Sequence, residues 1–213
     1  GVVCLRGLSP DRTRFELEYA LGRGSTDNSF LFFDDQSLDE ESHSVVLVHP
    51  PGAIYADVFL PALRSHVPNS TTRIQIVVGH VNPNRVDMLR RLALLYSSIE
   101  LICSNPGAKL LQDLWVQTKP SARGGEKKNN MPLPPVQVIR HETKLSTISE
   151  QEYHLRLLPT PTPRWPGGLL VFEETLGILM SDKFFSAHIC TTDWVEHSSS
   201  STAEERRHFY DCL

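Results

Sequence analysis

The sequence has no apolar run long enough to cross a membrane, which takes about 18 uninterrupted apolar residues. A net charge of -4 gives no excess of positive charge, which argues against a general nucleic-acid binder such as a nuclease. The first residues lack the basic-then-apolar order of a signal peptide. The four cysteines are scattered and form no CxxC pair, which argues against a disulfide framework or zinc ribbon and fits a reducing compartment.

The bulk composition is that of a globular protein. Of the 213 residues, 40% are hydrophobic and 22% are charged, so the chain can bury one good core and we expect a single domain. The chain begins without Met and stops inside an expected helix that starts at 202–210. We therefore interpret residues 1–213 as one domain of a longer or processed protein, truncated at its C-terminus.

Apolar runs and turn residues predict a chain of strands with helices between them. The expected strands are 14–20, 29–35, 44–50, 74–78, 99–104, 136–140, 152–160, 168–174 and 177–182. The expected helices are 55–66, 85–98 and 105–115, the last with Asn105 as its cap and Pro106 at its first position. Two groups of strands with helices between them indicate an α/β protein, a four-layer αββα sandwich.

Two polar or glycine-rich stretches interrupt this pattern. Residues 117–135 are basic and rich in proline and glycine, with almost nothing to bury, and we interpret them as a mobile surface insertion. Residues 22–25 contain a lone Gly-x-Gly that no helix follows, so a hairpin turn is favoured over a nucleotide cradle.

Candidate site residues follow the ends of several expected strands. His80, Asn82, Asn84 and Arg85 stand directly after the strand 74–78, in the rhythm of a metal-binding turn whose acids have become amides. Asp182 ends another strand, and Arg164 lies in the loop before a third. A lone histidine or aspartate in such a place is usually an ordinary loop residue. Together, however, these residues can meet in a crevice, because strand carboxyl ends converge at one edge of an α/β sheet.

The motifs VVGHVNPNR, CSNPGAKLLQDL, PRWPGGLLVFEE and ILMSDKFFSAH carry a family resemblance. Through them the chain resembles the metallo-β-lactamase-like domain of flavodiiron proteins, specifically the A-type paralogue of oxygenic phototrophs with degenerate diiron ligands. The resemblance covers nearly all of the chain outside 117–135. It implies an αββα sandwich of metallo-β-lactamase type, with a flavodoxin-like, FMN-binding domain that is absent from these residues.

The resemblance also assigns a role to each site position. His80 matches an iron ligand and Asp182 matches the carboxylate that bridges the two irons. Asn82 and Asn84 stand where the family has Glu and Asp, and both Arg85 and Arg164 stand where it has His. An amide offers a neutral carbonyl at best and a guanidinium offers no lone pair, so we expect neither iron nor any other resident cofactor in this domain.

Charge counting suggests what fills the space. Arg85, Arg164 and the neighbouring Lys183 supply three positive charges against the one carboxylate of Asp182. A buried charge without a partner would cost roughly 3–5 kcal/mol, so we predict that Asp182 pairs with one or both arginines. The surplus positive charge makes a small anion, chloride or a phosphate-like group, a candidate guest.

Two weaker signals lie nearby. His188, Asp193, Glu196 and His197 form a local cluster with irregular spacing, for which a solvated loop is favoured over a zinc site. Trp165 is interpreted as core packing rather than as a cofactor stack. The resemblance nevertheless places its loop near the flavin of a neighbouring subunit.

Three functions are compared. By resemblance, the parent protein is an oxidoreductase that reduces oxygen to water in photosynthetic electron transport, in the chloroplast stroma or the cyanobacterial cytoplasm. This chain would then act in a head-to-tail oligomer, with a metal-competent paralogue or with itself. The alternative is a non-catalytic module that binds an anion or a partner. Hydrolase activity is disfavoured, because the motif His-x-His-x-Asp-His is not present.

Overall fold

The computed structural model describes residues 1–12, 14–15, 19–20, 24–33, 44–116, 131–145, 153–185 and 189–193. Its larger sheet has the strand order β1-β4-β5-β6-β7-β8. These strands are β1 (Val2–Ser9), β4 (Ser25–Phe32), β5 (Ser44–Val48), β6 (Arg73–Val78), β7 (Ser98–Ser104) and β8 (Val136–Ile139). The pairs β1–β4 and β4–β5 are antiparallel, whereas β5 to β8 run parallel, so β5, β6 and β7 all end at one edge.

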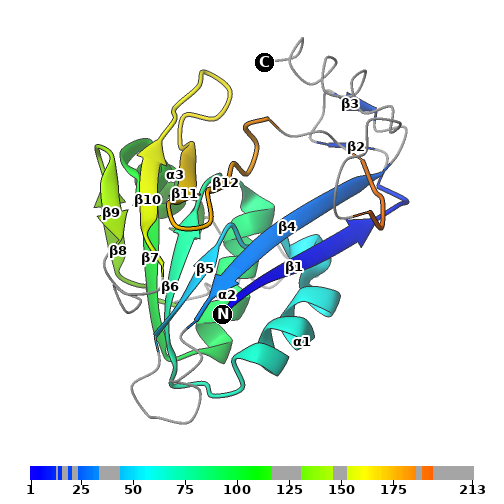
Figure 1. Cartoon of the computed structure of the whole chain (residues 1–213), viewed down its shortest axis with the longest axis horizontal. Coiled ribbons are helices and arrows are strands. Elements are labelled where there is room, and N and C mark those ends of the chain that lie inside the picture. Colours follow the sequence, from blue (N-terminus) through cyan, green and yellow to red (C-terminus); the bar gives the residue numbers. More distant parts are fainter. Residues whose placement is uncertain are drawn as a thin grey trace.

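The smaller sheet is antiparallel, with the order β12-β11-β10-β9. Its strands are β9 (Thr143–Leu145), β10 (Leu155–Pro159), β11 (Leu169–Glu173) and β12 (Ile178–Met180). A separate pair joins β2 (Arg14–Phe15) to β3 (Tyr19–Ala20). The helices are the 3-10 turn η1 (Ala53–Tyr55), α1 (Ala56–His66), α2 (Pro83–Leu95) and α3 (Asn105–Val116), and Figure 1 shows their arrangement around the larger sheet.

Successive residues of the larger sheet point into two different cores. In β5, Val45 and Leu47 pack with the buried faces of the helices, while Val46 and Val48 pack with the smaller sheet. A strand covered on both faces has no polar side, which explains the continuous apolar runs of β5 and β6. The layers are therefore helices, larger sheet and smaller sheet.

The predicted αββα class is consistent with these three layers. A second set of helices, the fourth layer, is not seen among the described residues, and the expected helix at 202–210 lies outside them. No helix within the described ranges is long and apolar enough to cross a membrane.

Several predicted boundaries are wrong. Strand β1 was not expected, and the single strand predicted over 14–20 is the short pair β2–β3. Strand β9 was also not expected. Helix α2 ends at Leu95, not at residue 98, because Tyr96 has an extended backbone that leads into β7. Of the turn predicted at 22–25, residues 22 and 23 lie outside the described ranges, whereas Gly24 has a positive φ of 69° directly before β4.

The structure describes only the end of the predicted insertion. Residues 117–130 lie outside the described ranges, but residues 131–135 contact the core. Met131 and Leu133 pack against the helical core cluster, the Trp115 indole N–H donates to the Met131 carbonyl at 3.0 Å, and the Leu101 N–H donates to the Pro135 carbonyl at 2.8 Å. The sequence 131–135 was misjudged because its prolines suggested a loop, although two of its apolar side chains are partly buried against the core.

Candidate functional site

Three of the predicted site residues meet at the carboxyl edge of the larger sheet. His80 follows β6, Arg85 stands in the first turn of α2, and Asp182 follows β12 of the smaller sheet. Asn82 caps α2, because its side-chain carbonyl accepts a hydrogen bond from the Arg85 N–H at 2.8 Å. Arg85 is thereby fixed on the same helical stripe as the buried Leu89 and Leu92, which directs its side chain inward.

The centre of the site is a buried ion pair between Arg85 and Asp182. One guanidinium nitrogen, Nη1, donates to Asp182 Oδ2 at 2.6 Å, and the other, Nη2, donates to Oδ1 at 3.2 Å. The Arg85 side chain is 2% exposed and that of Asp182 is 5% exposed. Nη1 also donates to the His80 carbonyl at 3.2 Å. The predicted pairing of Asp182 is thus observed with Arg85.

A second carboxylate, which the sequence did not suggest, faces the same guanidinium. Asp27 Oδ1, on β4, lies 3.6 Å from Arg85 Nη2, and the Asp27 side chain is 18% exposed. The contact is a charge interaction that is longer than a hydrogen bond. The sequence gives no signal for this contact, because Asp27 lies in a polar run, 25–29, of the antiparallel strand β4.

The two ionised groups stabilise each other. Burial alone would raise the pKa of Asp182, but the Arg85 guanidinium outweighs it and holds that pKa far below its usual range. Burial also disfavours the charged form of Arg85, yet Asp182 and then Asp27 raise its pKa above the ordinary value. Both groups are therefore charged at every physiological pH.

Two buried histidines adjoin the pair in their neutral form. Burial lowers the pKa of His80 to about 3. Burial likewise lowers the pKa of His49, which was not predicted as a site residue. Its Nε2 lies 3.1 Å from the Met180 carbonyl, and a side chain at Gly79 would collide with the His49 ring. His49 and Asp182 both have a left-handed backbone, with φ of 56° and 50°, an uncommon conformation for residues other than glycine.

Asn84 and Arg164 differ from Arg85 in their surroundings. Asn84 is exposed on the first turn of α2, next to Gly52, because that side of the helix faces away from the sheet. Arg164 is half-buried, with its guanidinium carbon 5.9 Å from the centre of the Trp165 ring. In the part of the chain that the structure describes, the salt bridge to Asp182 comes from Arg85.

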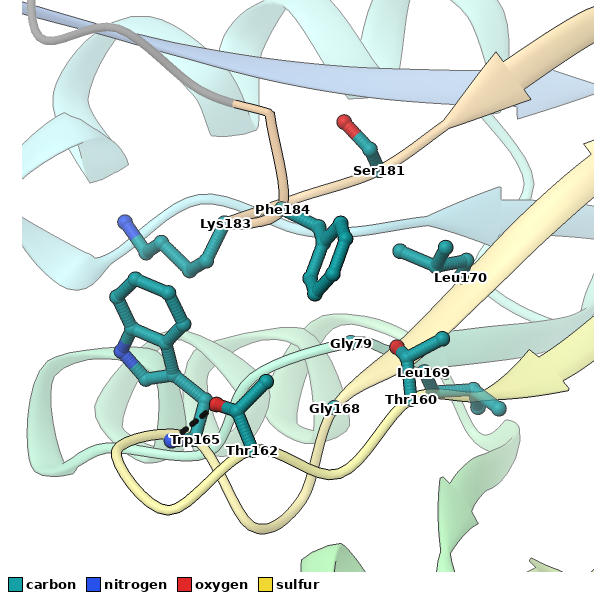
Figure 2. A pocket seen from close by; sticks show the side chains of 10 residues that line it. All are labelled: Gly79, Thr160, Thr162, Trp165, Gly168, Leu169, Leu170, Ser181, Lys183 and Phe184. Carbon is teal, nitrogen blue, oxygen red and sulfur yellow. Dashed lines mark hydrogen bonds between the residues drawn. The ribbon is translucent and has the colours of Figure 1, made fainter. Parts of the chain in front are cut away.

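A recess lies beside the site, between the loop 160–168 and the segment after β12. Figure 2 shows Thr162 and Trp165 on the loop and Lys183 and Phe184 on the opposite segment. The recess is small, since the volume open to the centre of a water molecule is about 10 Å³. Lys183, the predicted pocket charge, does line it, and burial lowers the pKa of this ammonium group despite nearby Asp27 and Asp182.

The loop 160–168 is held against the ends of β6 and β7. Ser104 Oγ donates to the Gly167 carbonyl at 2.9 Å and accepts from the Gly107 N–H at 3.2 Å. Ser104, not the predicted Asn105, therefore caps α3. Trp165 is buried with its ring edge-on to His80, the ring centres 6.3 Å apart, which supports its interpretation as a packing residue.

The cluster for which a solvated loop was favoured over a zinc site falls mostly outside the described residues. His188, Glu196 and His197 lie outside the described ranges. The Asp193 carbonyl accepts a hydrogen bond from Arg6 Nη1 at 2.5 Å. Within the described ranges, no group of three or more His, Cys, Asp or Glu side chains is arranged to hold a metal ion.

Several known proteins are similar to this chain in sequence and in fold. No model of a protein family matches the chain. The structure of a fragment of putative diflavin flavoprotein A 5 from Nostoc sp. PCC 7120 is 30% identical, with a TM-score of 0.78 over 100% of this chain and 74% of that one. The chain belongs to the flavodiiron family. The predicted metallo-β-lactamase-like fold is thereby confirmed.

Other relatives of this flavodiiron chain are also cyanobacterial. Putative diflavin flavoprotein A 6 of Nostoc is 34% identical over 98% of this chain, and A 3 of Synechocystis is 34% identical over 95%. The metal-soaked Flv1 flavodiiron core from Synechocystis is 31% identical, with a TM-score of 0.78 over 100% of this chain and 47% of that one. The chain spans about a third of the length of the curated relatives, 32% of A 6 and 30% of A 3.

Proposed function

We propose that this chain is the metallo-β-lactamase-like domain of a flavodiiron oxidoreductase in which a buried ion pair has replaced the diiron centre. The observation that carries the proposal is the two-point contact of Arg85 with Asp182. By the resemblance, Asp182 stands at the position of a carboxylate that would hold iron. Here both of its oxygens accept hydrogen bonds from a guanidinium, a group with no lone pair to give to a metal.

The surrounding residues also fit iron poorly. The side-chain carbonyl of Asn82 already accepts the capping hydrogen bond of α2, and Asn84 faces solvent. Arg164 lies over Trp165. Of the six family positions, only His80 and Asp182 retain a side chain of ligand type, and two such ligands do not offset the charge of two irons.

The role of the domain then lies in an assembly. We propose that oxygen is reduced to water at the diiron site of a metal-competent paralogue, in a head-to-tail oligomer with this chain, as part of photosynthetic electron transport. This chain would contribute electron entry or architecture. FMN would be bound by a flavodoxin-like domain, consistent with relatives that are named diflavin flavoproteins and are about three times as long. The cyanobacterial relatives favour the cyanobacterial cytoplasm or the chloroplast stroma as its location.

A non-catalytic module that binds a small anion or a partner is the second candidate. The observation that favours it is the recess beside the ion pair, which Lys183 lines. The two candidates differ in what they predict for oxygen reduction. The first expects this chain to increase oxygen reduction by a paralogue, whereas the second expects it to bind an anion or a partner without such an effect.

Elemental analysis of the purified protein after growth in iron-rich medium tests the proposal. We expect near-zero iron and zinc. The matched variant restores the family ligands through Asn82→Glu, Asn84→Asp, Arg85→His and Arg164→His, and it should gain metal in the same medium. Two irons per chain in the unaltered protein would overturn the proposal.

Oxygen uptake separates the two candidate functions. The protein alone should not reduce oxygen with an artificial electron donor, and adding a metal-competent paralogue should give more uptake than that paralogue gives by itself. If this chain adds nothing to the paralogue, the second candidate is preferred.

A further inference from the structure

The Arg85 side chain joins the three layers of the molecule at one point. Arg85 belongs to α2 in the helical layer, Asp27 belongs to β4 of the larger sheet, and Asp182 follows β12 of the smaller sheet. The guanidinium donates to Asp182 at 2.6 and 3.2 Å and lies 3.6 Å from Asp27. It also donates to the carbonyl of His80, just after β6. One side chain therefore links segments that are far apart in the sequence.

Strand geometry places Asp27 on the helical side of the larger sheet. Residues two apart on a strand share a face, so Asp27 lies on the same face of β4 as Ser25 and Leu31. Leu31 packs in the helical core, and Ser25 Oγ lies 3.0 Å from the hydroxyl of Tyr55 on η1. Asp27 therefore meets Arg85 because a regular, paired strand presents it to α2.

Asp182 is held by contacts of its own segment. The Phe184 N–H donates to the Ser181 carbonyl at 2.9 Å, which closes a turn around Asp182. The Met180 carbonyl, at the end of β12, lies 3.1 Å from Nε2 of the buried His49. A carbonyl only accepts, so this nitrogen of His49 donates. Both carboxylates that face the guanidinium are thus placed by contacts that do not involve it.

The acceptors are arranged for a planar cation with two nitrogens. Asp182 presents its two oxygens to the two terminal nitrogens of Arg85, one to each. One of these nitrogens also faces the His80 carbonyl, and the other faces Asp27. A guanidinium can make all of these contacts together because its donors form a fixed fork. An ammonium group is a single point charge and cannot occupy both nitrogen positions.

We propose that Asp27, Asp182 and the His80 carbonyl form a guanidinium-binding site, which the protein fills with its own Arg85. The inference deepens the proposed function and rests on it, since it takes this side chain as the permanent occupant of a site without metal. The bound group does the work of a structural cross-link between the helical layer and both sheets. When the Arg85 side chain is removed, the same site should accept a free guanidinium ion.

Chemical rescue of Arg85→Ala tests this site. Thermal unfolding of the variant is compared in millimolar guanidinium chloride and in sodium chloride at equal ionic strength. Guanidinium should raise the Tm of the variant, because it binds only the folded state. It should leave the Tm of the unaltered protein unchanged, because Arg85 already occupies the site. An equal response of both proteins, or none in the variant, would overturn the proposal.

Two further variants make the rescue specific. Arg73→Ala removes an arginine from the exposed pair with Glu100 and should not be rescued by guanidinium. Arg85→Lys keeps the positive charge but offers one nitrogen, so its Tm should lie below that of the unaltered protein. An unchanged Tm in Arg85→Lys would show that charge alone is needed, which contradicts a site built for guanidinium.

Adding Asp27→Asn to Arg85→Ala shows whether both carboxylates bind the ion. The guanidinium concentration that gives half of the Tm gain should rise several-fold, and an unchanged concentration would overturn the proposal. If Arg85→Ala is unfolded in sodium chloride, its refolding by guanidinium is measured instead, and a failure to refold counts against the proposal. Iron in the unaltered protein contradicts the proposed function, whereas a failed rescue in an iron-free protein contradicts this inference alone.

Discussion

Strand β6 has an arginine–carboxylate pair at each end, and the two pairs differ in their surroundings. At its start, Arg73 Nη2 lies 3.2 Å from Glu100 Oε2, with side chains 56% and 27% exposed. After its end, Arg85 binds Asp182 with side chains 2% and 5% exposed. The chemistry is the same, but water screens the first pair and is excluded from the second. Removing one partner should therefore cost more in the second pair, because the other charge would stay buried without it.

Removing one arginine from each end gives the largest contrast. Arg85→Met should lower the free energy of unfolding by about 3–5 kcal/mol, because Asp182 then remains buried and charged without its partner. Arg73→Met should lower it by about 0–1 kcal/mol, because Glu100 is partly solvated. Urea unfolding followed by circular dichroism measures both. Equal losses would show that the burial of the Arg85 pair does not govern its contribution.

The sequence located this buried end correctly for a topological reason. The parallel strands of the larger sheet end at one edge, so His80 and the start of α2 lie there. Asp182 reaches the same edge from the smaller sheet, because it follows β12. The inward direction of Arg85 was also encoded, by its spacing to Leu89 and Leu92. These features are local or follow from strand order.

The features that the sequence did not indicate depend on packing between distant strands. Asp27 reaches Arg85 across β4, and His49 was counted as part of a strand although the chain turns there with a positive φ. Cap identity was equally uncertain: of two similar Asn-Pro signals, Asn82 caps its helix, whereas at Asn105 the preceding serine does so. Here the structural context, not the residue type, decides the role.

The free energy of unfolding should also depend on pH, because of the buried His80 beside the Arg85–Asp182 pair. The pKa of His80 is lowered to about 3 in the folded state, so between pH 6.5 and 3 the unfolded chain binds a proton there that the folded chain does not. Stability is therefore lost as the pH falls through this window, by about 1.4 kcal/mol per unit for one proton, or about 2 kcal/mol from pH 6.5 to 5.

Replacing the histidine isolates this effect. His80→Gln should remove about one proton from the slope of unfolding free energy against pH, measured by urea titration at a series of pH values. Asp182 acts in a different window: its lowered pKa contributes stability that is present above about pH 4 and lost below it. A slope that His80→Gln leaves unchanged above pH 5 would contradict the assignment of a neutral His80.

The smallest expected effect compares serines at the two ends of β7. Ser104, at the buried end, makes two hydrogen bonds that join α3 to the loop carrying Trp165. Ser97, just before the strand, donates to the Ser70 carbonyl at 3.2 Å on the exposed side. Ser104→Ala should lower the free energy of unfolding by about 1 kcal/mol, the usual loss for a cap. Ser97→Ala should leave it unchanged within error, since water can replace its hydrogen bond.

Because the loop packs on His80 through Trp165, Ser104→Ala should also change the near-UV circular dichroism of the indole. If both variants have the same free energy of unfolding and that signal is unchanged, the loop is held by its own turn. In that turn the backbone N–H of Trp165 donates to Thr162 Oγ1 at 3.0 Å.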